Sequence, residues 1–281
     1  MPIQNSVHRR CSAPEYPEPQ LQGIVSLSAF PKSGVTYLSF LLFYCFFSDD
    51  HDVHDIERKY ILDIHAYPTA TFVDAAAPRL IKSHFPYNPA IPAVRLTAKT
   101  IYLMRHPIDV MMSAWDYEHL VTGIAPDAQS PAFRAYVQRW LMSGGLMMPQ
   151  FGPWTHHVRS WLGQTSIPLH LVTYQKLVDN PERELKSIID FIGIDVPIQR
   201  QQVAIERSSM KSMAALESQE VERRIDGVFF RNSLALGYDR GGRFINKGYR
   251  NSYAAVLTPQ ERALADKTFA NEIGRYFGNH S

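Results

Sequence analysis

Residues 23–47 limit the possible folds of this chain more than any other segment, because they combine an apolar strand, a tight turn and an apolar helix. Residues 24–29 have strand character. The apolar pattern is then interrupted at residues 31–34 by a proline, a serine and a glycine, which suit a tight turn. Residues 37–47 are typical of a buried helix. A polar loop between a strand and a helix suits a bound phosphate, because its backbone N–H groups point at the anion. The segment therefore predicts an α/β fold with a P-loop-like phosphate-binding loop after the first strand.

The side chains of this loop add to its affinity for anions. Lys32 contributes a positive charge, and Ser33 and Thr36 contribute hydroxyl donors. The loop is not a Walker A motif, G-x-x-x-x-G-K-[ST], because Lys32 precedes Gly34, the only glycine of the loop. Taken alone, the loop leaves open an ordinary turn between a strand and a core helix.

Further strands are expected to alternate with helices along the chain. The apolar pattern predicts strands near residues 79–83, at 99–104 and at 167–173. Helices are expected after each of them, and a capping box at residues 258–261 begins the last one. This alternation predicts a mainly parallel central sheet with helices on both faces. Residues 56–78 are mixed in character, which suggests an excursion facing a substrate.

Composition narrows the setting in which the protein acts. Its 281 residues suit one large domain, and the net charge of only +2 argues against a nucleic-acid partner. Residues 40–47, the longest apolar run, are far short of the ~20 residues that cross a bilayer, so no integral membrane segment is expected. Cys11 and Cys45 lie in unlike settings, which indicates a reducing compartment. We therefore expect a cytoplasmic protein.

The N-terminal residues and the histidine-rich stretch offer no candidate functional residues. Residues 1–20 carry several prolines and no apolar signal-peptide region, so they are expected to form a mobile leader before a single domain, residues 21–281. Residues 49–55 crowd histidines and aspartates together without fixing a coordination geometry. We expect a solvated loop there and no metal site.

Several segments resemble, in the same order, the motifs of the sulfotransferase family that uses 3′-phosphoadenosine 5′-phosphosulfate (PAPS). The resemblance runs from about residue 23 to residue 275. The matching segments are residues 31–37 (P-K-S-G-T-T-W in the family), 82–86 (K-T-H-x-P), 105–113 (R-N-P-x-D-V-x-x-S), 151–158 (a helix over the acceptor side) and 171–181 (Y-E-D-x-x-x-x-P).

The resemblance implies catalytic roles for His84, Lys32 and Lys82. Transfer of a sulfuryl group to a hydroxyl needs a base for the acceptor and positive charge for the transferring and leaving groups. His84 matches the family's general base, and its ordinary pKa suits proton transfer near neutral pH. Lys32 is placed to neutralise the charge on the leaving oxygen. Lys82 lies on the same strand face as His84 and is placed to reach the sulfuryl oxygens. No metal is required for this chemistry.

The resemblance also implies a set of residues that bind PAPS and its product, adenosine 3′,5′-bisphosphate (PAP). Arg105 and Ser113 would hold the 3′-phosphate, and Tyr174 would contact the nucleotide. The complete set is Lys32, Ser33, Gly34, Val35, Thr36, Tyr37, Arg105, Ser113, Tyr174, Ser209, Met210, Asn246, Lys247 and Gly248.

Four of these residues depart from the family pattern. Val35 replaces a threonine and so loses one hydroxyl contact. Tyr37 replaces the tryptophan that stacks on adenine, and Met210 replaces the second stacking aromatic residue. Asn246 replaces an arginine and so removes one charge from the 3′-phosphate, which Arg243 or Arg250 is available to restore.

The predicted function is transfer of a sulfuryl group from PAPS to a hydroxyl of a small or medium-sized, partly apolar acceptor. A nucleotide-dependent kinase and a non-catalytic nucleotide-binding protein are the alternatives. Residues 50–78 and 120–153, which are expected to shape the acceptor pocket, resemble the family least, so the acceptor and the oligomeric state stay open. Within this part, Met147 and Met148 are expected in the core. The pair at residues 156–157 is expected to straddle a helix surface.

Overall fold

The computed structural model describes residues 21–47, 50–65, 80–245, 248 and 253–278. The leader expected at the N-terminus lies outside the described residues. None of the helices in this part of the chain has the length and apolar character needed to cross a membrane.

A five-stranded parallel sheet forms the centre of the fold, with strand order β2-β3-β1-β4-β5. The strands are β1 (Ile24–Ala29), β2 (Ile61–Asp63), β3 (Leu80–Ser83), β4 (Thr97–Met104) and β5 (Leu169–Thr173). The middle strand, β1, pairs in parallel with β3 and β4. The expected parallel sheet is confirmed, whereas the edge strand β2 was not anticipated, because three residues are too few to show an alternating pattern.

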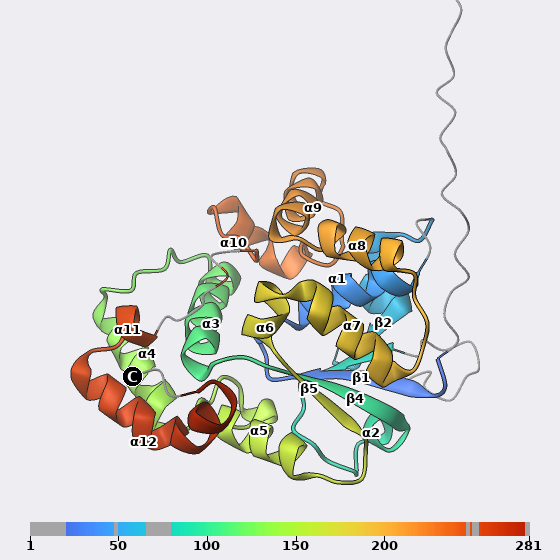
Figure 1. Cartoon of the computed structure of the whole chain (residues 1–281). Helices are drawn as coiled ribbons and strands as arrows, with labels where there is room; N and C mark the ends of the chain where they lie inside the picture. The colour runs from blue at the N-terminus through green and yellow to red at the C-terminus, as the bar shows by residue number, and fades with distance from the viewer. Residues whose placement is uncertain (1–20, 48–49, 66–79, 246–247, 249–252, 279–281) are drawn as a thin grey trace, which may run out of the picture.

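Helices cover both faces of this sheet, as expected (Figure 1). They are α1 (Val35–Phe46), α2 (Pro92–Arg95), α3 (Pro107–Thr122), α4 (Pro131–Met142), α5 (Trp154–Gly163), α6 (Tyr174–Asp179), α7 (Pro181–Ile192), α8 (Ile198–Arg207), α9 (Met210–Arg223), α10 (Ala235–Asp239), α11 (Tyr253–Val256) and α12 (Pro259–Tyr276). A π-helical turn, Ile56–Tyr60, precedes β2.

The side chains of β4 show how the two faces are divided. Ile101 and Leu103 belong to the apolar cluster that contains the helix α1 and parts of α7 and α8. Tyr102 and Met104 point to the opposite face, where they join residues of α4, α5 and α12. This alternation follows from the two-residue period of a strand. It fixes the sheet between two helical layers, so that the loops after its strands are held rigidly at one edge.

Local sequence signals set the ends of several helices where they were expected. The Asn180 side chain accepts a hydrogen bond from the backbone N–H of Arg183, which begins α7, and Gly193 ends this helix with φ of 83°. Thr258 and Glu261 form the reciprocal capping box of α12. These contacts satisfy N–H groups that a helix start leaves without partners.

We predict that Thr258→Ala lowers the free energy of unfolding by about 1 kcal/mol, because it removes the side-chain acceptor of the first turn of α12. Thr258→Ser keeps a hydroxyl and serves as the matched control. Urea unfolding of the three proteins measures the difference. Equal stability of the alanine variant and the wild-type protein would show that the cap contributes nothing.

Candidate functional site

A cavity of about 400 Å³ opens at the carboxyl ends of β1, β3, β4 and β5. Ligands of open parallel sheets bind at this edge, because the strand-to-helix loops converge there. Most of the predicted site residues line the cavity, namely Lys32, Gly34, Val35, Thr36, Tyr37, Lys82, His84, Arg105, Ser113, Tyr174, Met210 and Gly248.

The loop after β1 is a tight turn that depends on one glycine. The Ser33 N–H donates to the Phe30 carbonyl, and Lys32 and Gly34 both have positive φ, of 65° and 97°. A Cβ at Gly34 would lie 2.5 Å from the ring of Tyr174, so no larger residue fits there. Gly34 also provides no side-chain cap for α1, which leaves the first N–H groups of the helix available to a ligand.

Ser33 places a further donor beside this loop. Its side chain is fully buried, it does not line the cavity, and its Oγ has no hydrogen-bond partner among the described residues. Buried hydroxyls are rarely left unpaired, so this oxygen marks a point where the loop has spare hydrogen-bonding capacity.

The Lys32 ammonium lies between two aromatic rings. Its Nζ is 4.0 Å from the ring centre of Tyr117 and 4.1 Å from that of Phe244. Burial, followed by the neighbouring charges of Arg105 and Lys82, lowers the pKa of Lys32 to about 7. The rings of Tyr117 and Phe244 contact the ammonium, while the charges of Asp116 and Glu217 oppose the fall in its pKa.

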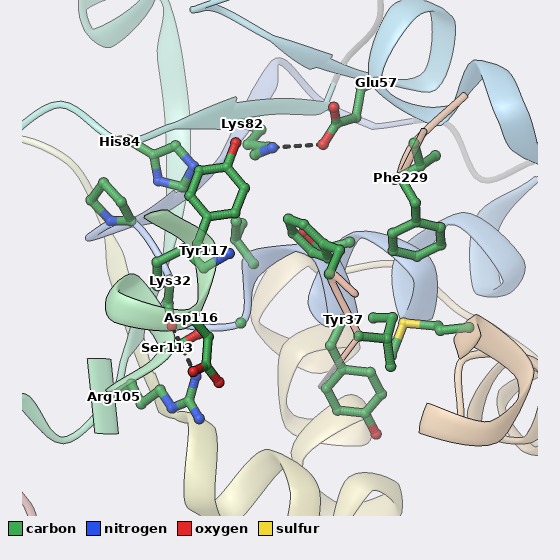
Figure 2. A pocket seen from close by; sticks show the side chains of 18 of the residues that line it. Lys32, Tyr37, Glu57, Lys82, His84, Arg105, Ser113, Asp116, Tyr117 and Phe229 are labelled. Atoms are coloured by element: carbon green, nitrogen blue, oxygen red, sulfur yellow. Dashed lines mark hydrogen bonds and ion pairs between the residues drawn. The ribbon is translucent and has the colours of Figure 1, made fainter. Parts of the chain in front are cut away.

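Arg105 and Ser113 lie at the same end of the cavity as Lys32 (Figure 2). Arg105 is buried, and its Nη1 donates to the Lys32 carbonyl at 2.9 Å. The guanidinium lies 4.3 Å from the ring centre of Tyr174. Ser113 is half-buried on α3. This end of the cavity thus presents two cations, a hydroxyl and the uncapped start of a helix, a donor set that suits phosphate groups.

His84 projects into the cavity with a defined tautomer. Its Nδ1 lies 2.8 Å from the Ala29 carbonyl, which only accepts, so Nδ1 carries the proton and Nε2 keeps a lone pair. Burial, and then the positive charge of Lys82, lowers the pKa of His84 to about 3. The ring is therefore neutral, with the lone pair on Nε2, throughout the physiological range. The expectation of an ordinary pKa for His84 is wrong, because burial and the charge of Lys82 disfavour the protonated ring.

Other histidines hold the backbone of His84 in place. The His84 N–H donates to Nε2 of His65 at 2.7 Å, and its carbonyl lies 3.2 Å from Nε2 of His157. Nδ1 of His157 is 2.9 Å from the hydroxyl of Tyr102. The expectation that the pair at 156–157 straddles a helix surface is right for the exposed His156 and wrong for His157, which is fully buried. Sequence reasoning missed this role, because it requires contacts between distant segments.

Lys82 has two carboxylate partners that the sequence did not reveal. Its Nζ lies 2.6 Å from Glu57 and 3.0 Å from Asp63 (Figure 2). The second carboxylate oxygen of Glu57 accepts a hydrogen bond from Nη2 of Arg231 at 2.6 Å. Two of the three N–H donors of Lys82 are thus engaged, and its expected contact with the sulfuryl oxygens stays a prediction. Glu57 lies in the unanticipated π-helical turn and Asp63 in the unanticipated β2, so no sequence signal identified them.

The remaining predicted residues divide into three groups. Ser209 does not line the cavity, and its hydroxyl caps α9 by accepting from the Ser212 N–H. Asn246 and Lys247 lie outside the described residues. Met147 and Met148, which were expected in the core, line the cavity.

Two residues that sequence reasoning missed, Tyr117 and Phe244, contact Lys32 directly. Tyr117 lies one helical turn after Ser113, a spacing that could have identified it. In the expected solvated stretch, His54 instead pairs with the buried Glu220. The described residues contain no group of three or more metal-ligating side chains.

We predict that Asp63→Asn lowers stability at pH 7 and that this loss shrinks in acid. Burial raises the pKa of Asp63, but the charge of Lys82 and the N–H of His65 outweigh it and hold the pKa well below its ordinary value. The carboxylate thus stabilises the fold above about pH 4, its unfolded pKa, and this contribution is lost as the pH falls through the folded-state pKa.

Urea unfolding of wild type and Asp63→Asn at pH 7 and pH 3 tests this. Asp190→Asn is the control, because Asp190 pairs with Lys186 on the exposed surface and such pairs contribute about 0–1 kcal/mol. A loss for Asp63→Asn that is the same at both pH values would contradict the assignment.

Comparison with known proteins identifies the family. The sulfotransferase domain family matches residues 24–277. Sulfotransferase 1A1 of Bos taurus is 28% identical over 261 residues, covering 88% of this chain and 82% of that protein. Sulfotransferase 1A1 of Canis lupus familiaris is 29% identical over 201 residues, covering 66% of this chain and 64% of that protein. Cytosolic sulfotransferase 8 of Arabidopsis thaliana is 23% identical over 266 residues, covering 86% of this chain and 74% of that protein.

Solved structures share the fold. Mouse sulfotransferase SULT7A1 complexed with PAP has a TM-score of 0.61 and 18% identity, covering 92% of this chain and 87% of that one. Retinol dehydratase in a complex with retinol and PAP has a TM-score of 0.64 and 18% identity, covering 91% and 82%. The α/β architecture built on a parallel sheet is thereby confirmed. This chain belongs to the sulfotransferase domain family, whose enzymes depend on PAPS.

Proposed function

We propose that this protein transfers the sulfuryl group of PAPS to a hydroxyl of a small or medium-sized, partly apolar acceptor and releases PAP. The arrangement of His84 supports this most strongly. Its Nδ1–H is committed to the Ala29 carbonyl, which leaves Nε2 as a base in the same cavity as Lys32 and Arg105. A base and an anion-binding end in one cavity are what sulfuryl transfer to a hydroxyl requires.

The donor set of the cavity fits a nucleotide with two phosphate positions. Lys32, Thr36 and the uncapped start of α1 would hold the 5′ side, while Arg105 and Ser113 would hold the 3′-phosphate. Tyr37 and Met210 line the cavity where the base would lie. PAPS supplies the sulfuryl group when bound. Contacts from Ser209, Asn246 and Lys247 stay predictions.

The catalytic side chains divide the work between proton and charge. His84 accepts the proton of the acceptor hydroxyl at Nε2, and Lys32 neutralises charge at the leaving-group end. Lys82 has three N–H donors, of which Glu57 and Asp63 take two, so one is left for the acceptor or the transferred group. Its carboxylates thereby orient the ammonium.

The acceptor end of the cavity is largely apolar. Met147, Met148 and Phe151 line the cavity together with His84, which would face the acceptor. Aromatic and thioether groups provide adaptable apolar contacts, which supports a partly apolar acceptor. Membership of the sulfotransferase domain family favours this function over the kinase alternative. We place the reaction in the cytoplasm, because a relative carries the name Cytosolic sulfotransferase 8.

We predict that PAP binds in the presence of EDTA and that Arg105→Ala weakens this binding by about 2 kcal/mol or more, as for a lost charge-assisted contact. Adenosine 5′-phosphosulfate lacks the 3′-phosphate, so the same substitution should lower its affinity much less. Calorimetry with both ligands measures this, with Arg139→Ala as a control because Arg139 is exposed on α4. Equal losses for the two ligands would remove Arg105 from the 3′-phosphate site.

We predict that His84→Ala lowers turnover by roughly 10²–10⁴-fold and leaves PAP affinity nearly unchanged, because a base acts on the acceptor and not on the nucleotide. Lys32→Ala should instead reduce both, because Lys32 faces the phosphates before and during transfer. The acidic limb of turnover due to His84 should lie far below pH 6.5, since the pKa of His84 is lowered to about 3 and protonation removes the base.

Steady-state kinetics with an acceptor that is sulfated by the wild-type protein, and calorimetry with PAP, give the two readouts. His156→Ala is the matched control, because His156 is an exposed histidine on α5. Near-normal turnover of His84→Ala, or a loss of PAP binding as severe as that of Lys32→Ala, would refute the mechanism.

A further inference from the structure

Two buried glutamates on α9 hold two separate walls of the cavity. Glu217 and Glu220 lie one turn apart, and their exposed fractions are 1% and 0%. Neither lines the cavity itself. Each binds backbone N–H groups of a different segment, so a single helix fixes both segments.

Glu220 anchors the first of these segments, residues 228–230. Its carboxylate accepts from the N–H groups of Val228 at 3.1 Å, Phe229 at 2.7 Å and Phe230 at 2.9 Å, and it contacts Nδ1 of His54 at 2.8 Å. Val228 and Phe229 line the cavity. This carboxylate therefore has its full set of partners and holds a turn in one conformation.

Glu217 anchors the wall that contacts the phosphate loop. One of its oxygens accepts from the N–H of Phe244 at 2.5 Å and the other from the N–H of Ile245 at 3.0 Å. Both residues line the cavity. Two consecutive N–H groups on the two oxygens of one buried carboxylate fix the direction of this backbone, and hence where the Phe244 side chain points.

The Phe244 ring carries this placement to Lys32. The centre of this ring lies 4.1 Å from Nζ of Lys32. The centre of the Tyr117 ring lies 4.0 Å from the same Nζ atom. Tyr117 belongs to the helix α3, whereas Phe244 follows α10 in a loop. The Phe244 ring also packs against the rings of Tyr117 and Phe229, with ring centres 5.9 Å and 5.6 Å apart. These rings hold the side chain, while Glu217 holds the backbone that carries it. Glu217 also acts on Lys32 directly, because its charge opposes the fall in the pKa of this lysine.

We propose that Glu217 is a positioning residue for the reaction: its carboxylate holds the Phe244 ring against the Lys32 ammonium and so fixes the lysine at the phosphate end of the cavity. The consequence for PAP rests on the proposed function, whereas the placement of Lys32 does not. Glutamine cannot replace Glu217, because its NH₂ group would face one of the two backbone N–H donors.

NMR of protein labelled with ¹³C-lysine tests the placement without any ligand. Protons at Cε of a lysine between two aromatic faces are shifted upfield by the ring currents, and Lys32→Ala identifies the signal by its loss. We expect Glu217→Gln and Phe244→Leu to move this signal toward the position of an ordinary lysine. Glu222→Gln, which changes an exposed glutamate on the same helix, should leave the signal in place.

Calorimetry with PAP tests the consequence by a double-mutant cycle. Phe244→Leu and Glu217→Gln should each weaken PAP by roughly 3- to 30-fold, the range for a partly desolvated cation–π contact converted to affinity. The double variant should be no weaker than the worse single variant, because both changes break the same chain of contacts. Losses that multiply, or an unshifted Lys32 signal in Glu217→Gln, would overturn the proposal.

Two further outcomes are distinguishable. If wild-type protein does not bind PAP but the Lys32 signal moves in Glu217→Gln, the proposed function fails while the placement of Lys32 by Glu217 stands. If Glu217→Gln does not fold, Glu217→Asp decides the question. Its carboxylate is withdrawn by one methylene group, so the Lys32 signal should move part of the way, and an unmoved signal would refute the proposal.

Discussion

The close packing of the Tyr174 ring on Gly34 is the contact on which the site depends. Tyr174 follows β5 at the edge of the sheet, and Gly34 lies in the loop after the central strand β1. A Cβ at Gly34 would come within 2.5 Å of the ring, so this approach is open only to glycine. The same ring carries the guanidinium of Arg105, which in turn binds the Lys32 carbonyl. One contact between two strand ends thus positions both cations of the phosphate end.

Three of the cationic side chains that line the cavity, Lys32, Lys82 and Arg105, are held in different ways. Lys82 forms ion pairs with Glu57 and Asp63, which stabilise its charged form and orient its ammonium group. Arg105 donates to the Lys32 carbonyl and lies against the ring of Tyr174. Lys32 has rings on two sides, and its pKa is lowered to about 7. Lys32 is therefore the cation whose charge depends most on what enters the cavity.

The sequence was sufficient to predict the elements that local patterns define. The loop at Lys32 and Gly34, the parallel sheet and the capped starts of α7 and α12 all follow from short-range signals. Contacts between distant segments could not be predicted in this way. Glu57 and Asp63 approach Lys82 from a π-helical turn and a three-residue strand, neither of which has a usable period. The burial of His157 beneath His84 likewise became evident only from the fold.

We propose that a nucleotide and a hydroxyl acceptor meet in this cavity and that a sulfuryl group passes from the nucleotide to the acceptor. Mass spectrometry of the wild-type protein incubated with PAPS and a panel of hydroxylated, partly apolar metabolites tests it most directly. We expect one or more acceptors to gain about 80 daltons, the mass of a sulfuryl group replacing a proton, with an equal amount of PAP formed. Acceptors that gain a phosphoryl group from ATP, with no gain from PAPS across the panel, would contradict it.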